Sequence, residues 1–111
     1  MNNQKLYKGS LQTIVLNLLD EKGRLYGYEI TKLVKEQTQG ELQITEGALY
    51  PTLHKLEGEG VLQVEMELVN NRQRKYYSLT KKGRLEKVKR LEDLARFLQT
   101  MEGLIAPKVK A

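Results

Sequence analysis

The sequence predicts a mainly α-helical protein with one small β-hairpin. Three observations support this fold class: three short segments carry apolar residues at helical spacing, residues 61–79 alternate between apolar and polar side chains, and residues 80–105 return to helical spacing over a longer stretch. The chain has 111 residues, of which 40% are hydrophobic and 30% are charged. This length and composition suit one folded domain with one modest core.

The first two predicted helices each have one apolar face between two boundary residues. The first begins after Ser10, a residue type that favours the N-cap, and ends at Gly23. Its stripe consists of Leu11, Ile14, Val15, Leu18 and Leu19. The second follows Gly27 and ends at Gly40. Its apolar face is made by Ile30, Leu33 and Val34. Because each helix is short, it needs neighbours to bury that face.

The third predicted helix covers residues 45–60 and contains a proline. Thr45 suits its N-cap and Gly60 its C-terminal end. Pro51 removes the hydrogen bond to the carbonyl of Gly47, four residues earlier, at a cost of about 3 kcal/mol. Since Gly47 has no Cβ, the backbone can tilt there, and the pair predicts a helix with a bent or opened first turn. The alternative is a helix that begins at Pro51, the favoured N1 position.

Residues 61–79 predict two strands. The buried face of the first strand is formed by Leu62, Val64, Met66 and Leu68. NNRQR follows as a polar tip, in which Asn70 and Asn71 suit a turn. KYYSL returns with Tyr77 and Leu79 on one face. Two strands alone are barely stable, so the hairpin must pack on the helices. Three helices followed by a hairpin predict a winged helix–turn–helix, in which the third helix lies in a DNA major groove and the hairpin is the wing.

Residues 80–105 predict a long helix whose apolar stripe has no packing partner in that domain. Thr80 caps it, and it continues to about Leu104, a length of about 35 Å. Its apolar stripe is Leu85, Val88, Leu91, Ala95, Leu98, Met101 and Ile105. A second copy of the same helix is the simplest partner, since two-fold dimers are the commonest oligomers. We therefore predict a winged helix–turn–helix domain at residues 1–79 and a C-terminal dimerisation helix and tail at residues 80–111.

The net charge of +5 is concentrated in one segment. Residues 70–90 have a net charge of +8, whereas residues 41–69 have a net charge of −5. A basic segment beside an acidic or neutral remainder favours a polyanion partner such as DNA. The alternative is a solvated surface without a partner.

Several classes of protein are disfavoured. The chain has no cysteine for disulfides or thiolate metal sites, and no apolar run approaches the roughly 18 residues of a membrane span. The start, MNNQKLYKGS, lacks the apolar segment of a signal peptide, so we expect a cytoplasmic protein. Asp20 and Asp93 are its only aspartates, it has one histidine, and no glycine-rich phosphate loop follows a strand. We therefore expect no enzyme activity, no cofactor and no metal.

Three stretches of this sequence resemble one protein family. LYGYEI, GALYPTLHKLEGEGVL and RKYYSLTKKGR, followed by a single terminal helix, resemble the PadR-type transcriptional regulators of the short form over about residues 6–90. The resemblance implies a homodimeric DNA-binding repressor, dimerised by its terminal helix. It also implies that the helix with the Tyr-Pro pair is the recognition helix, which favours the bent helix. Ligand-responsive members imply an aromatic or planar effector near the dimer interface.

Candidate DNA contacts lie on the third helix, on the wing and beside two helix starts. Those on the helix are Thr45, Glu46, Gly47, Ala48, Tyr50, Pro51, Thr52 and Lys55. Those on the wing are Arg72, Arg74 and Lys75, and Lys8 and Tyr28 are further phosphate candidates. Thr45 could instead serve only as a cap, and Tyr50 could pack in the core. Glu46 could accept from a cytosine amino group or only favour the helix dipole.

A second group of candidates concerns an effector. Leu94, Phe97, Met101 and Leu104 combine an aromatic ring with a flexible thioether, which can form an adaptable apolar pocket. The alternative is that all four pack against the first helix of either subunit.

The rival function for the whole chain is a winged-helix protein-interaction module, which the acidic segment would suit. The basic hairpin tip favours DNA, and we predict a near-palindromic double-stranded operator as the partner.

Overall fold

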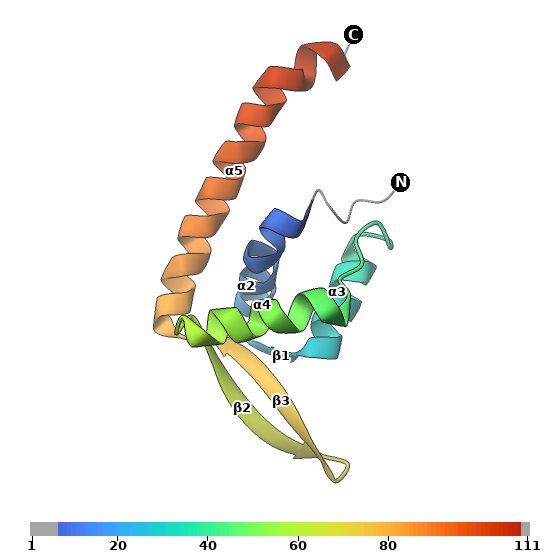
Figure 1. Cartoon of the computed structure of the whole chain (residues 1–111), viewed down its shortest axis with the longest axis vertical. Coiled ribbons are helices and arrows are strands. Elements are labelled where there is room, and N and C mark those ends of the chain that lie inside the picture. The colour runs from blue at the N-terminus through green and yellow to red at the C-terminus, as the bar shows by residue number, and fades with distance from the viewer. Residues whose placement is uncertain (1–6, 110–111) are drawn as a thin grey trace.

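The structure, a computed structural model, describes residues 7–109 as a small domain from which one helix and one hairpin project (Figure 1). In chain order the elements are η1, a 3-10 turn (Lys8–Ser10), α2 (Leu11–Lys22), β1 (Arg24–Tyr26), α3 (Gly27–Gln37), α4 (Glu46–Gly58), β2 (Leu62–Val69), β3 (Arg72–Leu79) and α5 (Lys81–Val109). The molecule measures 58 × 30 × 21 Å along its principal axes. The wing lies at one end of the long axis and the tip of α5 at the other.

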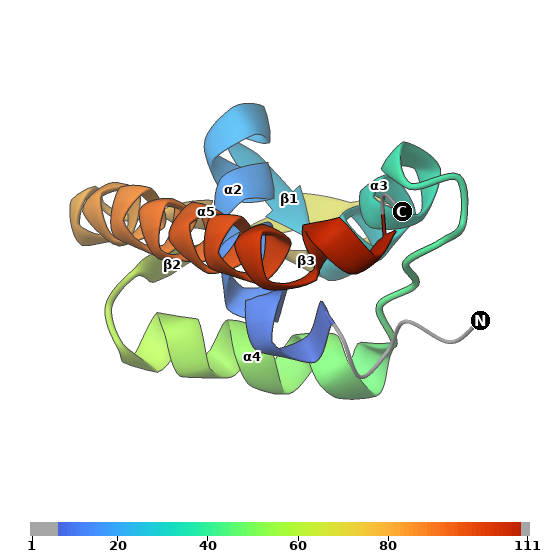
Figure 2. The ribbon, with the colours of Figure 1, turned by 90° about the horizontal axis from the view of Figure 1, so that it is seen from above.

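The core lies where α2, α3 and α4 meet the base of the sheet. Its most deeply buried side chains, at most 1% exposed, are Val15, Leu16, Leu19, Ile30, Leu49, Leu53, Leu56 and Tyr77. The predicted apolar faces of the first three helices are therefore confirmed, although Ile14 and Leu33 are only partly buried. α3 lies on the side of the domain away from the first turns of α5 (Figures 1 and 2).

The predicted helix ends are largely confirmed. Gly23 ends α2 with a φ of 88°, a conformation that favours glycine. Ser10 occupies the predicted N-cap position of α2, but its hydroxyl makes no capping hydrogen bond, and the turn η1 precedes the helix. α3 begins at Gly27 itself, and its N-cap residue is Tyr26, whose backbone N–H donates to Glu29 Oε1 over 3.1 Å.

A third strand joins the hairpin. Within residues 7–109 the sheet is antiparallel with the order β1-β3-β2, so the prediction of only two strands is wrong. In β1, Leu25 pairs with Tyr77 of β3 and Tyr26 pairs with Tyr76. β1 has three residues, which is too short for an alternating pattern to be recognised. This strand gives the hairpin the neighbour that its stability requires.

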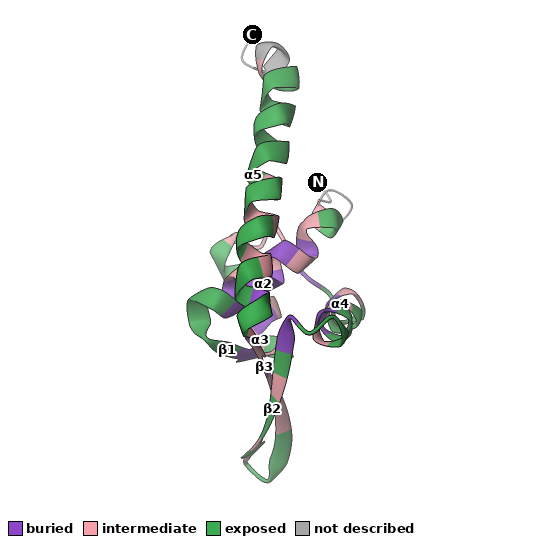
Figure 3. Cartoon of the chain, turned by 90° about the vertical axis from the view of Figure 1, so that its left-hand side faces the viewer, coloured by how far each residue is buried: buried purple, intermediate pink, exposed green. Residues whose placement is uncertain are grey.

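The hairpin extends beyond the core. Asn70 and Asn71 form its two-residue turn with φ values of 50° and 62°, so the tip is shorter than predicted and β3 begins at Arg72. Leu62 is buried, but Met66 and Leu68 are 55% and 63% exposed. The prediction of a buried face along the whole strand is therefore wrong at the outer half, because no helix covers that part of the projecting wing (Figures 1 and 3).

The last helix is longer than predicted. The Gly83 backbone N–H donates to Thr80 Oγ1 over 3.0 Å, which confirms the predicted cap, and α5 continues past Leu104 to Val109. Its first turns pack against α2, whereas most of its length stands away from the domain and is exposed (Figure 3). Over residues 7–109, none of the helices has the length and hydrophobicity needed to cross a membrane.

Candidate nucleic-acid interface

The helix predicted for DNA recognition is α4, and it begins at the predicted N-cap. The Ala48 backbone N–H donates to Thr45 Oγ1 over 3.2 Å, so Thr45 is a cap. α4 begins at Glu46 and continues through Pro51, which makes the alternative start at Pro51 wrong. Glu46 lies in the first turn, where its negative charge favours the helix dipole.

One face of α4 is turned away from the core. Leu49, Leu53 and Leu56 are fully buried and fix this orientation. The exposed side of the helix and its cap consists of Thr45, Glu46, Gly47, Tyr50, Pro51, His54 and Lys55. Ala48 and Thr52 are half-buried, and the Thr52 hydroxyl donates to the Ala48 carbonyl over 3.0 Å. The predicted contacts on α4 therefore form one surface, with the last two at its edge.

Gly47 has open space around it. A Cβ built on Gly47 would meet only Thr45 Oγ1, at 4.0 Å. The fold itself therefore does not require a glycine at this position. A residue without a side chain at the exposed start of α4 allows another molecule to approach the backbone closely.

Tyr50 joins α4 to α3 while part of its ring stays exposed. A Cβ built on Gly27 would lie 2.4 Å from Tyr50 Oη, so the ring lies directly over this glycine. Tyr50 remains 37% exposed. Partial burial, followed by the charge of Glu46, raises the pKa of the Tyr50 hydroxyl. Tyr50 therefore fixes how α4 is seated on α3, and its outer edge still belongs to the exposed surface.

The basic residues of the wing lie on both of its faces. In the β2–β3 register, Lys75 pairs with Met66 on the face turned towards α4, and Lys75 Nζ lies 3.6 Å from Glu57 Oε1 of that helix. Arg72 and Arg74 lie on the opposite face, because successive residues of a strand alternate in direction.

Aromatic rings hold two arginines on that opposite face. The guanidinium of Arg74 lies 4.2 Å from the ring centroid of Tyr26, and that of Arg24 lies 4.2 Å from the ring of Tyr76. Arg24 also pairs with Glu65 at 2.9 Å and with Glu67 at 2.5 Å. A guanidinium stacked on a ring keeps the N–H groups at its edge available, so Arg74 is oriented for contact with a phosphate.

The two weaker phosphate candidates are exposed. Lys8 lies in η1, and Tyr28 is 61% exposed at the start of α3. Tyr28 borders a shallow groove whose other lining residues are Thr31, Lys32, Lys35, Gln43 and Ile44. The sequence interpretation missed Lys32 and Lys35. Their spacing of three residues on the polar side of α3 is the signal that could have identified them.

The basic segment of residues 70–90 divides into two groups. Arg72, Arg74 and Lys75 belong to the wing. At the base of α5, Lys87 Nζ lies 2.8 Å from Asp20 Oδ2, and Arg90 pairs with Glu59 and Glu86. Lys87 and Arg90 therefore hold this helix to the domain, whereas Lys81, Arg84 and Lys89 of the same segment are exposed.

The stripe predicted for dimerisation is largely uncovered. Its exposed members are Leu85, Val88, Ala95, Leu98, Met101 and Ile105, whereas Leu91 is half-buried between α5 and the domain. Of the effector candidates, Leu94 and Phe97 line a groove of about 610 Å³ between α5 and the start of α2. Met101 and Leu104 lie further along α5 and outside that lining. The structure therefore brings two of the four effector candidates together.

Comparisons with known proteins agree with this geometry. Residues 15–90 match the transcriptional regulator PadR-like family. A transcriptional regulator of Mycobacterium tuberculosis is 40% identical over 67 residues, which cover 58% of this chain and 63% of that protein. A solved structure of a transcriptional regulator from Clostridium thermocellum has a TM-score of 0.84 at 28% identity, covering 91% of this chain and 98% of that one. A PadR family regulator from Eggerthella lenta gives 0.76 at 27% identity, covering 91% and 82%. The winged-helix fold class is thereby confirmed, and these relatives are regulators rather than enzymes.

Proposed function

This chain belongs to the PadR-like family of transcriptional regulators, and on that premise we propose that it is a homodimeric repressor that binds a near-palindromic operator. The observation that carries the proposal is the exposed face of α4, which has Thr45 as its N-cap, together with the basic wing, whose Lys75 pairs with Glu57 of this helix. Its place of action is the cytoplasm, where the operator is found.

In the proposed complex α4 enters the major groove with its N-terminal half towards the bases. Gly47 and Pro51 carry no long side chain on the exposed helix start, so the backbone approaches the DNA at these two positions. Arg72, Arg74 and Lys75 on the wing contact phosphates, and Lys32 and Lys35 on α3 add further positive charge beside Tyr28. These contacts position the protein, while residues at the start of α4 read sequence.

The proposed dimer is formed by α5 from each subunit. Its uncovered side chains include Leu85 at 71%, Leu98 at 56% and Ile105 at 46% exposure. Burying a leucine or isoleucine side chain is worth about 1.5–3 kcal/mol, so a stripe of this length can hold two subunits together. Two copies of α4 then meet DNA about one helical turn, or 34–36 Å, apart, which requires a near-palindromic operator.

We also propose that a small aromatic effector releases the protein from DNA. The groove lined by Leu94 and Phe97 lies between α5 and α2, where a ligand can act on both elements. A ligand releases DNA only as far as it binds the released arrangement more tightly, by about 1.4 kcal/mol for each tenfold loss of affinity.

The rival function, a protein-interaction module, has less support. Its strongest argument was the acidic segment of residues 41–69. Several of those carboxylates pair within the chain, however: Glu57 with Lys75, Glu59 with Arg90, and Glu65 and Glu67 with Arg24. Less negative charge is therefore left for a protein partner.

Selection of bound duplexes from a random DNA pool tests this proposal. We expect a near-palindromic site whose half-sites lie about 10 base pairs apart, and an affinity at least about 10³-fold higher than that for a scrambled duplex. The affinity should fall as salt rises, because phosphate contacts release counterions. Absence of enrichment, together with no binding to any duplex at low salt, would contradict DNA binding and leave the rival function.

A further inference from the structure

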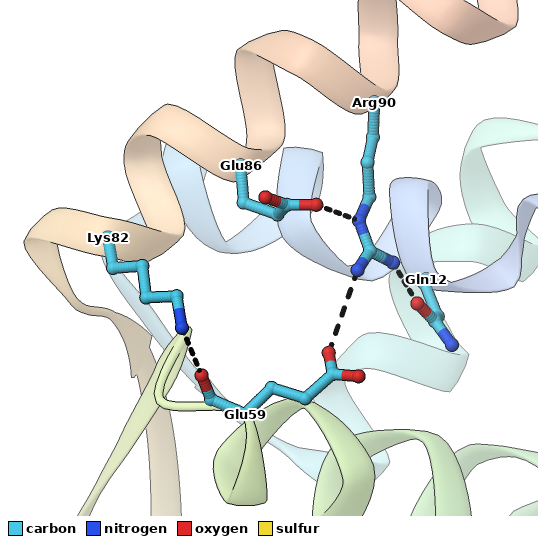
Figure 4. A network of polar contacts seen from close by, with 5 residues as sticks. All are labelled: Gln12, Glu59, Lys82, Glu86 and Arg90. Carbon is cyan, nitrogen blue, oxygen red and sulfur yellow. Dashed lines mark hydrogen bonds and ion pairs between the residues drawn. The ribbon is translucent and has the colours of Figure 1, made fainter.

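A network of polar contacts joins the C-terminal end of α4 to α5 (Figure 4). Glu59 follows the last residue of α4, and Gly60 then adopts a φ of 78°. The Gly60 backbone N–H donates to the Glu57 carbonyl and the Val61 N–H to the Leu56 carbonyl, the pattern that closes a helix end firmly. Glu59 therefore has a fixed position relative to α4.

The first turn of α5 is attached to this same helix end. The Thr80 hydroxyl donates to the Gly60 carbonyl over 2.7 Å, and Lys82 Nζ donates to the Glu59 carbonyl over 2.8 Å. A Cβ built on Gly83 would lie 2.0 Å from the Val61 carbonyl oxygen, so the helix and this loop are in direct contact. These contacts fix where α5 begins. Because they are confined to one turn, they leave its tilt less constrained.

Arg90 provides a second attachment farther along the helix. Its Nη2 lies 3.6 Å from Glu59 Oε1, its Nε donates to Glu86 Oε1 over 2.9 Å, and its Nη1 donates to Gln12 of α2. Arg90 lies eight residues beyond Lys82, which corresponds to about 12 Å along α5. Together with the packing of α5 on α2, this second attachment to the end of α4 defines the angle between α4 and α5.

We propose that the Arg90–Glu59 pair is a latch that sets the angle between the recognition helix and α5, and thereby the spacing of the two DNA half-sites. The second part of the inference rests on the proposed dimer and operator. The 14 residues from Glu59 back to Thr45 along α4 span roughly 21 Å. A tilt of α4 by about 10° around Glu59 therefore moves the start of this helix by about 4 Å, close to the rise of one base pair. Arg90 and Glu59 are in this sense positioning residues for DNA recognition.

A distance measurement tests the angle without DNA. The chain has no cysteine, so nitroxides can be placed on His54→Cys in α4 and Thr100→Cys in α5, both exposed. Labelled chains diluted into unlabelled ones report the distance within one chain. We expect Arg90→Gln to broaden or shift the distance distribution. Arg96→Gln, which breaks the exposed Arg96–Asp93 pair within α5, is the matched control and should leave the distribution unchanged.

A second measurement tests the spacing with operators whose half-sites are moved apart or together by one base pair. We expect Arg90→Gln to lose about tenfold in affinity at the preferred spacing and to discriminate less between spacings, while Arg96→Gln keeps the wild-type profile. Glu59→Gln should reproduce the effect, and it carries the test if Arg90→Gln does not fold, because the Glu59 carbonyl still binds Lys82.

The two measurements separate the possible failures. An unchanged distance distribution in folded Arg90→Gln and Glu59→Gln would overturn the latch. A broadened distribution with an unchanged spacing profile would overturn its role in half-site spacing. A broadened distribution in a protein whose wild type binds no duplex would support the angular latch, overturn its role on DNA and contradict the proposed function.

Discussion

α4 and α5 differ in what holds them and in what they leave uncovered. α4 buries Leu49, Leu53 and Leu56 completely and exposes a largely polar face. α5 buries no apolar side chain completely between Lys81 and Ala106, is fixed at its base by ion pairs and hydrogen bonds, and exposes an apolar stripe. The partners proposed for the two helices differ accordingly: DNA for α4 and a second copy of the chain for α5.

The largest expected effect is the loss of the dimer on substitution of the apolar stripe of α5. Leu98→Glu places a charge in the proposed dimer seam, at a cost of several kcal/mol unless the carboxylate reaches water. We expect sedimentation to show a monomer, with operator affinity reduced to that of a single half-site. Thr100→Glu adds the same charge at an exposed position on the opposite side of α5, off the stripe, and should remain dimeric. If Leu98→Glu and Leu91→Glu together leave a folded dimer, the seam lies elsewhere.

The contact between Tyr50 of α4 and Gly27 of α3 predicts a loss of folding stability, an effect smaller than that of Leu98→Glu on the dimer. Gly27→Ala places a Cβ 2.4 Å from Tyr50 Oη, so the ring must move, and we expect the free energy of unfolding to fall by about 1–3 kcal/mol. Urea denaturation at fixed protein concentration measures this. Adding Tyr50→Ala should remove most of the effect of Gly27→Ala, because the clash is then absent. Equal losses with and without the tyrosine would show that this contact does not seat α4.

The sequence predicts the packed parts of this molecule better than the projecting ones. The faces of α2, α3 and α4 follow from helical spacing, because residues at that spacing share one side whatever the neighbour. The alternation in β2 likewise predicted that one face of the strand carries Leu62, Val64, Met66 and Leu68. It contains no information on how much of that face the helices cover. Met66 and Leu68 were therefore expected to be buried and are exposed.

Charge counting has a similar limit at the candidate site. A net charge of +8 over residues 70–90 favoured a polyanion, yet Lys87 and Arg90 pair with Asp20 and Glu59, which are distant in sequence. Pairing of this kind depends on the tertiary structure and has no local signal. The same holds for the position of Arg74 over Tyr26, since the two residues meet only because β1 joins the sheet.

A substitution on the wing should reduce DNA affinity moderately and by the same factor for every DNA sequence. Arg74→Ala removes one proposed phosphate contact, so affinity should fall for specific and scrambled duplexes alike, and the slope of log affinity against log salt should decrease by about 1. Arg96→Ala removes the same charge from the outer part of α5 and should leave the slope unchanged. A loss confined to the selected operator would instead assign base reading to Arg74.

The smallest expected effect is that of Gly47→Ala, which tests whether the glycine at the start of α4 serves folding or DNA binding. Gly47→Ala adds a methyl group that meets only Thr45 Oγ1 at 4.0 Å, and alanine favours a helix over glycine by up to about 1 kcal/mol. We therefore expect a slightly more stable protein that binds its operator more weakly, because the methyl group lies where the backbone approaches DNA. Gly58→Ala, in the last turn of the same helix and also in open space, is the matched control. It should gain stability without losing affinity, since it lies far from the helix start that is proposed to read bases. Calorimetric unfolding and operator titration of both variants provide the comparison. If Gly47→Ala binds the operator as tightly as the wild type, the start of α4 does not approach DNA closely, and the glycine there serves neither the fold nor the contact.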